Sequence, residues 1–149
     1  MKIKTFFQKD KFLPIFILLT LSIVFFDQLF KFLIYQFQPQ WNLSILKIHF
    51  IQNTGAGFGI LQNQSFWLGL ISLVVAIVII ISYTKIPKER VPQLLFALFL
   101  GGVLGNMIDR LFRKFVIDFV DFSFWPAFNL ADSCVTIAVI GLICYFWKE

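Results

Sequence analysis

The chain has 149 residues, of which 59% are hydrophobic and only 14% are charged, and its mean hydropathy is +0.84. A soluble domain of this size could not hide so much apolar surface, so the composition excludes an ordinary water-soluble enzyme and favours an integral membrane protein. The formal net charge of +5 would suit a nucleic-acid-binding protein, but the positions of the basic residues point to another origin for this charge.

Four apolar stretches are each long enough to cross a bilayer core of roughly 30 Å as a helix. They cover residues about 12–35, 66–83, 91–108 and 132–147. We therefore expect one membrane domain over residues 1–149, an all-α integral membrane protein with four transmembrane helices. Two outer segments, about 36–65 and 109–131, would form a small extracytoplasmic β-containing segment and a long outer loop.

The basic residues predict the orientation of these spans. Eight of the thirteen lysines and arginines fall on one side of the membrane if both termini are cytoplasmic. They are Lys2, Lys4, Lys9, Lys11, Lys85, Lys88, Arg90 and Lys148. Cytoplasmic loops are enriched in Lys and Arg, so we expect a multi-pass protein with both termini in the cytoplasm. The positive charge is then mainly a topology signal, and no nucleic-acid partner is expected.

This topology gathers five carboxylates at the outer ends of the spans. They are Asp27, Asp109, Asp118, Asp121 and Asp132. An ionisable group at a membrane boundary is costly and is usually functional. A pair of carboxylates can also cut a peptide bond without a metal ion, which suggests a membrane aspartic hydrolase. The alternatives are a small proton-coupled four-span transporter, although transporters usually keep their acids near the midplane, and a helical adaptor without catalytic activity.

The first outer segment has two patterns. Apolar residues alternate with polar ones through residues 41–45, and the alternation continues through 46–50 in the opposite phase. Alternation predicts short strands, and the one-residue slip predicts a β-bulge. Residues 53–59 then hold three glycines within five positions, which predicts tight turns or the close approach of a ligand.

Spacing places several residues on shared helix faces. Asp27 and Lys31 are four residues apart on the first span and predict an ion pair, which would either pin the helix end or contact a substrate. Gly101 and Gly105 have the same spacing on the third span and predict close packing of another helix. A second set shares a face at the end of the third span: Asn106, Asp109 and Arg110.

The remaining candidates are less determined by spacing. Asn129 and Asp132 are three residues apart at the start of the fourth span, where Asp132 could simply be an acid favoured by the helix dipole. Asp118 has no periodic pattern to support it, and a loop aspartate is usually solvated. Asp121, three residues further on, is not excluded as the working partner. The single histidine, His49, leaves no Cys/His set for zinc, and we expect no metal and no other cofactor.

Five short blocks follow one another along the chain. They are DQLFK at 27–31, NTGAGF at 53–58, GGVLGNMIDR at 101–110, VIDF at 116–119 and FNLADS at 128–133. Together, on a four-span chain of this length, they resemble the signature blocks of the lipoprotein signal peptidase family, also called signal peptidase II. The resemblance covers essentially the whole chain. Two positions depart from the family pattern: Phe30 stands where a small hydroxyl residue is usual, and Gly57 where alanine is common.

The resemblance implies a membrane aspartic endopeptidase that removes the signal peptide from diacylglyceryl-modified prolipoproteins, cutting before the lipidated cysteine. It implies Asp118 and Asp132 as the catalytic pair, and so decides against Asp121. Supporting or substrate-binding roles are expected for Asn53, Asn106, Asp109, Arg110 and Asn129, and the spacing adds Asp27 and Lys31. The expected partners are lipid-modified prolipoproteins and membrane lipids. The expected state is a monomer in the bacterial cytoplasmic (inner) membrane, with the active site on the outer face.

Overall fold

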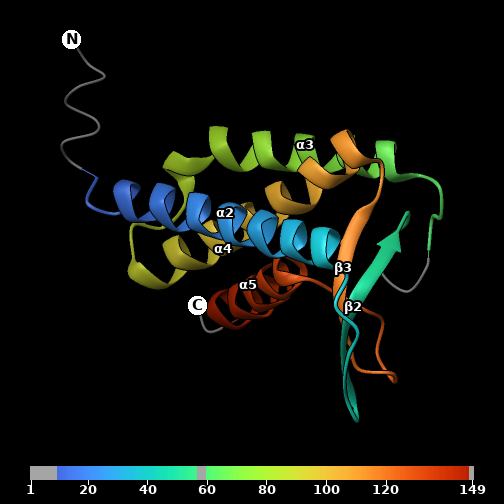
Figure 1. The fold of residues 1–149 in the computed structure, drawn as a ribbon. Helices are drawn as coiled ribbons and strands as arrows, with labels where there is room; N and C mark the ends of the chain where they lie inside the picture. Colours follow the sequence, from blue (N-terminus) through green and yellow to red (C-terminus); the bar gives the residue numbers. More distant parts are fainter. Residues whose placement is uncertain (1–9, 57–59, 148–149) are drawn as a thin grey trace.

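The computed structural model describes residues 10–56 and 60–147. That part of the chain contains four long helices and one three-stranded antiparallel sheet (Figure 1). The helices are α2 (Leu13–Phe37), α3 (Ser65–Ile81), α4 (Arg90–Ile108) and α5 (Leu130–Phe146). The strands are β1 (Trp41–Leu43), β2 (Leu46–Asn53) and β3 (Val116–Asp121). A 3-10 turn, η2 (Tyr83–Lys85), follows α3, and a π-helical turn, η3 (Asp109–Arg113), continues α4.

A helix covers each of the four predicted spans. The helical stretches Leu13–Phe37 and Arg90–Arg113 are long and apolar enough to cross a membrane, and α3 and α5 are shorter apolar helices of 17 residues each. Several residues behind the orientation and turn predictions lie outside the described residues. These are Lys2, Lys4, Lys9, Gly57, Gly59 and Lys148.

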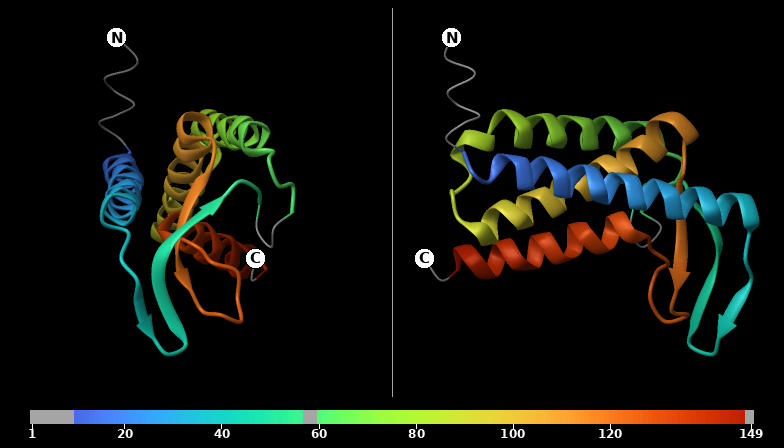
Figure 2. Two further views of the ribbon diagram at one scale, coloured as in Figure 1. Left: turned by 45° about the vertical axis from the view of Figure 1, so that its right-hand side comes forward. Right: turned by 60° about the vertical axis from the view of Figure 1, so that its left-hand side comes forward.

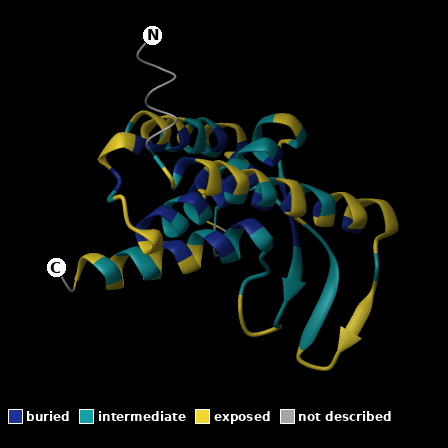
Figure 3. Cartoon of the chain, turned by 90° about the vertical axis from the view of Figure 1, so that its left-hand side faces the viewer, coloured by how far each residue is buried: buried dark blue, intermediate teal, exposed yellow. Residues whose placement is uncertain are grey.

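The helices run alongside one another, and the sheet stands at one end of the bundle (Figure 2). α2 begins and α5 ends at the opposite end. Exposed residues lie along the outward sides of the helices (Figure 3). Large apolar residues such as Leu18 and Ile81 are among the exposed ones. In contrast, Asp27 and Lys31 are fully buried. An apolar exterior around a polar centre is the arrangement expected of a protein surrounded by lipid.

Small residues on α4 bring the helices into close contact, as the Gly101 and Gly105 spacing predicted. A Cβ on Gly101 would lie 2.8 Å from the Cβ of Ile23 on α2. A Cβ on Gly105 would lie 2.6 Å from Oδ2 of Asp27, also on α2. α4 is therefore the central helix against which the polar residues of α2 are pressed.

The predicted bulge at the phase slip is wrong. β1 and β2 form a tight hairpin in which Leu43 pairs with Leu46, so the two residues between them form the turn, with Ser44 at φ 69°. Reversal of the chain, rather than an extra residue, produces the change of phase. A register shift does occur further along β2, between Ile48 and Ile51 where it pairs with β3.

Residues 109–131, expected as a long outer loop, are a loop only in part. This segment begins with the π-helical turn η3 and continues as β3, which adds to β2 to complete the sheet in the order β1-β2-β3. The run of β-branched and aromatic residues in Val116–Asp121 is the signal that could have predicted a strand.

Candidate functional site

Asp118 lies in the middle of β3, and its environment differs from that of a solvated loop residue. It pairs with Ile51 of β2 and is only 2% exposed. At the end of β2, the side chain of Asn53 donates a hydrogen bond of 2.9 Å to Oδ2 of Asp118. The amide oxygen of Asn53 accepts from the backbone of Gly55, which fixes the direction of this side chain. Strand pairing therefore buries Asp118 and supplies one of its donors.

Asp132 occupies the first turn of α5, where it takes part in a reciprocal capping box. Asn129 is the N-cap residue, and its side-chain oxygen accepts from the backbone N–H of Asp132 at 2.9 Å. Oδ2 of Asp132 accepts from the backbone N–H of Asn129 at 3.1 Å. The expected stabilising acid at the helix start is thus present, and the cap fixes the direction of its carboxylate.

Two asparagine amides connect the carboxylates of Asp118 and Asp132. Nδ2 of Asn129 donates to Oδ1 of Asp118 at 2.7 Å and to Oδ1 of Asn106 at 3.1 Å. Nδ2 of Asn106 in turn donates to Oδ1 of Asp132 at 2.7 Å. The sheet, α4 and α5 thereby place both carboxylates on one continuous chain of hydrogen bonds.

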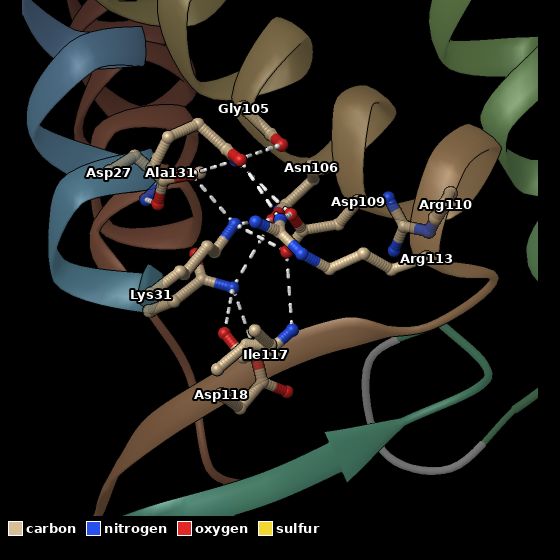
Figure 4. Close-up of polar contacts among 12 residues, drawn as sticks. Asp27, Lys31, Gly105, Asn106, Asp109, Arg110, Arg113, Ile117, Asp118 and Ala131 are labelled. Atoms are coloured by element: carbon tan, nitrogen blue, oxygen red, sulfur yellow. Dashed lines mark hydrogen bonds and ion pairs between the residues drawn. The ribbon is translucent and has the colours of Figure 1, made fainter. Parts of the chain in front are cut away.

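Lys31 fixes the orientation of Asn106. Its ammonium group lies 2.7 Å from Asp27, 3.1 Å from Asp109 and 2.9 Å from Oδ1 of Asn106, and all three charged side chains are fully buried (Figure 4). An ammonium group can only donate, so Asn106 must turn its oxygen to Lys31 and its NH₂ group to Asp132. The predicted Asp27–Lys31 ion pair is confirmed, and it lies behind the carboxylate pair.

Spacing missed two members of this buried network. Gln28 donates to Asp109 at 3.1 Å and accepts from Arg113 at 2.9 Å, and Arg113 also forms an ion pair with Asp109. Arg113 lies four residues after Asp109, which is a usable signal. Nothing in the spacing singles out Gln28. Asp109 also accepts from the backbone N–H of Ile117 at 3.2 Å, which ties η3 to the start of β3.

Among the described residues, Arg110 forms no hydrogen bond or ion pair with this network. Its guanidinium reaches the backbone oxygen of Gly55 at 3.5 Å, and its buried Nε has no hydrogen-bond partner among the described residues. Arg110 and Asp132 line a cavity of about 420 Å³ together with aromatic and small residues of the β3–α5 connection and α5. Asp118 lines a second cavity of about 300 Å³, and Asn53 contributes to both. Asp132 and Asp118 therefore line two adjoining cavities.

The five carboxylates that the sequence predicted at the outer ends of the spans differ in their neighbours. Asp27 and Asp109 are neutralised by Lys31, and Asp121 lies 3.0 Å from His49 in a partly exposed pair. The hydrogen bond from His49 lowers the pKa of Asp121. Within residues 10–56 and 60–147, neither Asp118 nor Asp132 forms an ion pair with a basic side chain. They are the two carboxylates still available for chemistry.

Burial raises the pKa of Asp118 to about 7, and the negative charge of Asp132 adds to the rise. Hydrogen bonds from Asn53 and Asn129 act in the opposite direction because they favour the ionised form. Asp118 therefore keeps its proton to an unusually high pH. A buried carboxyl group with a raised pKa beside a second carboxylate is the arrangement that acid–base catalysis requires.

Comparison with known proteins bears on the identity of this site. A family model described as signal peptidase (SPase) II matches residues 19–148. The chain belongs to the signal peptidase II family. This signal peptidase is 40% identical over 136 residues to the lipoprotein signal peptidase of Moorella thermoacetica, covering 87% of this chain and 90% of that one. It is 44% identical over 110 residues to the lipoprotein signal peptidase of Francisella tularensis subsp. novicida, covering 67% and 68%.

Solved structures agree with this assignment. The signal peptidase superimposes on a bacterial membrane enzyme, solved in meso at 2.3 Å resolution, with a TM-score of 0.84. The two chains are 30% identical, and the match covers 91% of this chain and 88% of the other. A bacterial membrane enzyme solved at 1.9 Å gives a TM-score of 0.81 at 31% identity, covering 91% and 94%. The predicted family is confirmed, and the protein is a membrane-bound peptidase.

Proposed function

We propose that this signal peptidase removes the signal peptide from lipid-modified prolipoproteins, with Asp118 and Asp132 as its catalytic pair. One observation carries the choice of residues. These are the two outer carboxylates without a basic partner in the described part of the chain, and the Asn129 side chain bonds to both residues. The names of the relatives, lipoprotein signal peptidases, support the substrate class.

The proposed reaction uses one proton shared by two carboxyl groups. Asp132, as the ionised member, takes a proton from a water molecule, and the water oxygen attacks the scissile carbonyl carbon. Asp118 holds its proton up to a pH of about 7 and donates a hydrogen bond to the carbonyl oxygen. The C–N bond then breaks as the leaving amine receives a proton from the pair, and the acid and amine products separate.

The neighbouring residues have positioning roles in this proposal. Asn106 and Asn129 hold Asp132 and Asp118, respectively, in position through hydrogen bonds of 2.7 Å each. Arg110 lines the same cavity as Asp132 and has an unpaired buried Nε, so it is the group available to bind a backbone carbonyl of the substrate. Lys31, with Asp27 and Asp109, forms the rigid charged support behind them.

We further propose a single membrane domain that crosses the membrane four times, with both termini in the cytoplasm and the active site on the outer face. The arrangement of the bundle supports this, because the sheet and the start of α5 lie at the end opposite to the start of α2 and the end of α5 (Figure 2). The sheet carries Asp118, and the start of α5 carries Asp132. The 17 residues of α3 and of α5 span about 25 Å as helices, close to the thickness of a bilayer core. The monomer is the proposed working state.

A lipid-modified substrate suits this location. A diacylglyceryl group on the cysteine anchors that residue in the outer leaflet, so the adjacent peptide bond is held at the membrane surface. The cavities at Asp118 and Asp132 lie at the same level under the proposed topology. The apolar surfaces of the helices would lie against the transmembrane part of the signal peptide. The anchoring lipid would therefore position the scissile bond at the pair.

The substrate proposal is tested with two matched synthetic precursors that differ only at the cysteine. One carries a diacylglyceryl group and the other a free thiol. The full-length protein in detergent micelles should release the signal peptide from the lipidated precursor, with a cut immediately before the cysteine, and leave the other intact. Equal cleavage of both would contradict the role of the lipid. Proton-driven solute uptake into vesicles, without cleavage, would favour the transporter alternative.

A further inference from the structure

A second polar pocket, separate from the carboxylate pair, lies at the start of α3. It has a volume of about 550 Å³ and is formed where α3 meets the turn η3 that leads from α4 to β3 (Figure 1). Its lining residues are Thr54, Asn63, Ser65, Phe66, Leu111 and Lys114. None of them belongs to the proposed catalytic or supporting set, so the reaction leaves this pocket unassigned.

The helix that ends in this pocket has an uncapped N-terminus. Gln64 is the N-cap residue of α3 and makes no side-chain capping bond, and the first turn carries no acidic residue. The first backbone N–H groups of a helix have no partners within it and carry a partial positive charge. In α5, by contrast, Asn129 and Asp132 form a capping box that provides partners for these N–H groups. The start of α3 is therefore prepared for an anion from outside the helix.

Ser65 gives an independent indication that this pocket binds a ligand. It is the first residue of α3, is 5% exposed and lines the pocket. Its hydroxyl oxygen has no hydrogen-bond partner among the residues that the structure describes. A buried hydroxyl without a partner costs free energy, and rotation about its Cα–Cβ bond can direct it at a group bound in the pocket. A ligand with acceptor oxygens would remove that cost.

Lys114 adds a full positive charge to the same lining. It adopts a left-handed backbone conformation with φ 67° between η3 and β3, and its exposed side chain contributes to the pocket. In the described part of the chain its side chain forms no ion pair. Phe66 and Leu111 provide an apolar wall beside these polar groups. The pocket thus combines a cation, a hydroxyl and a helix N-terminus with an apolar surface.

We propose that this pocket binds the phosphate group of a membrane phospholipid. Phosphate oxygens match the ammonium of Lys114, the hydroxyl of Ser65 and the free N–H groups of α3. Phe66 and Leu111 lie against the glycerol and the upper part of the acyl chains. The start of α3 and η3, which line the pocket, lie at the same end of the bundle as the sheet that carries Asp118 (Figure 1). Under the proposed topology this end is at the level of the outer-leaflet headgroups.

A phosphate bound here would act on the turn that carries Arg110. Gly69, one turn further along α3, allows the helix to touch η3, since a Cβ at this position would lie 2.7 Å from Leu111 and 3.1 Å from the Cβ of Arg110. The lipid would fasten the start of α3 to η3 at a point next to this contact. Arg110 would then be held at the cavity by lipid as well as by protein contacts.

The test measures binding and does not depend on the proposed reaction. Full-length protein, stripped of lipid in a phosphate-free neutral detergent, is titrated with phosphatidylglycerol, and bound lipid is counted by native mass spectrometry. The wild type should bind one phosphatidylglycerol molecule at least about tenfold more tightly than Ser65→Ala or Lys114→Gln, as expected for loss of a charge-assisted hydrogen bond. Lys47→Gln, which removes a lysine from β2, is the matched charge control and should bind like the wild type.

Inorganic phosphate is the second probe and separates the two sources of this chemistry. Phosphatidylglycerol binding much tighter than inorganic phosphate would support a lipid site, and equal affinities would contradict the lipid assignment. Equal lipid affinity of the wild type and both pocket variants would overturn the site itself. A cleavage assay checks that both pocket variants are folded. In lipid-free detergent, Ser65→Ala and Lys114→Gln should cleave a lipidated precursor at the rate of the Lys47→Gln control.

Discussion

The side-chain amide of Asn129 donates a hydrogen bond of 2.7 Å to Asp118. The oxygen of the same side chain caps α5, so one residue both starts the helix and holds a carboxylate. Replacement by serine keeps a capping oxygen but removes the contact with Asp118. We expect Asn129→Ser to lower kcat by up to roughly tenfold, the effect of losing one hydrogen bond to a neutral carboxyl group. The melting temperature should fall as well, because serine also loses the buried bonds from Asn129 to Asn106 and to the backbone of Ile117.

Asn129→Ala serves as the comparison for this prediction. Alanine lacks the capping oxygen as well, so α5 should lose roughly 1 kcal/mol more of stability than in the serine variant. Steady-state kinetics on a lipidated precursor and thermal unfolding in detergent separate the two effects. Wild-type turnover by Asn129→Ser would remove Asn129 from the catalytic arrangement.

The raised pKa of Asp118 predicts the pH dependence of cleavage. If Asp118 must be protonated, kcat/KM should decline on the alkaline side with an apparent pKa of about 7, the value at which this carboxyl loses its proton. The hydrogen bond from Asn53 lowers the pKa of Asp118. Asn53→Ala should therefore raise that pKa and move the alkaline decline to higher pH. A decline that stays in place, or moves to lower pH, would contradict the assignment of the proton.

Lys31 is expected to be essential for folding stability. Its removal in Lys31→Met leaves Asp27 and Asp109 as buried carboxylates without their shared cation, which typically costs roughly 3–5 kcal/mol. Lys88→Met is a control of identical chemistry, because Lys88 pairs with Asp10 at 2.8 Å in a partly exposed position. An exposed pair contributes only about 0–1 kcal/mol. Chemical unfolding in mixed micelles should show that Lys31→Met is less stable than Lys88→Met. Equal stability of the two variants would contradict a structural role for the buried cluster.

Close packing of α4 against α5 gives a prediction with a matched control. A Cβ on Gly102 would lie 2.5 Å from the backbone oxygen of Ala131, next to Asp132, and backbone cannot move aside cheaply. Gly141 lies at the same helix pair, but its added Cβ would meet the flexible end of Leu95 at 2.6 Å. We expect Gly102→Ala to lower both melting temperature and kcat, and Gly141→Ala to be much milder. Similar effects at both positions would show that the start of α5 has more freedom than its contacts indicate.

Local sequence patterns predicted the parts of the site that depend on neighbours along the chain. Hydropathy located the four helices, and i, i+4 spacing predicted the Asp27–Lys31 ion pair and the close approach at Gly101 and Gly105. The burial of Asp118 was not predictable in this way, because it arises when β3 pairs with β2, whose Ile51 lies far away in the sequence. Without that pairing, the same residue reads as a solvated loop aspartate.

Gln28 and the β1–β2 hairpin also could not be predicted from local sequence patterns. Gln28 is tied to Asp109 and Arg113 across separations of 81 and 85 residues, so no local pattern marks it. In the hairpin, a reversal of the chain and a bulge produce the same change of phase in the sequence. Pairing of Leu43 with Leu46 is the observation that distinguishes them.

The most direct measurement of the central claim is cleavage of a diacylglyceryl-modified precursor by Asp118→Asn and by Asp132→Asn. Asparagine preserves the size of each side chain but cannot exchange the proton, and thermal unfolding shows whether each variant is folded. The conservative variant Asp121→Asn, outside the pair, is the control and should cleave at nearly the wild-type rate. We predict that both single variants lose cleavage while remaining folded. Retained cleavage by either folded variant would contradict the assignment of Asp118 and Asp132 as the catalytic pair.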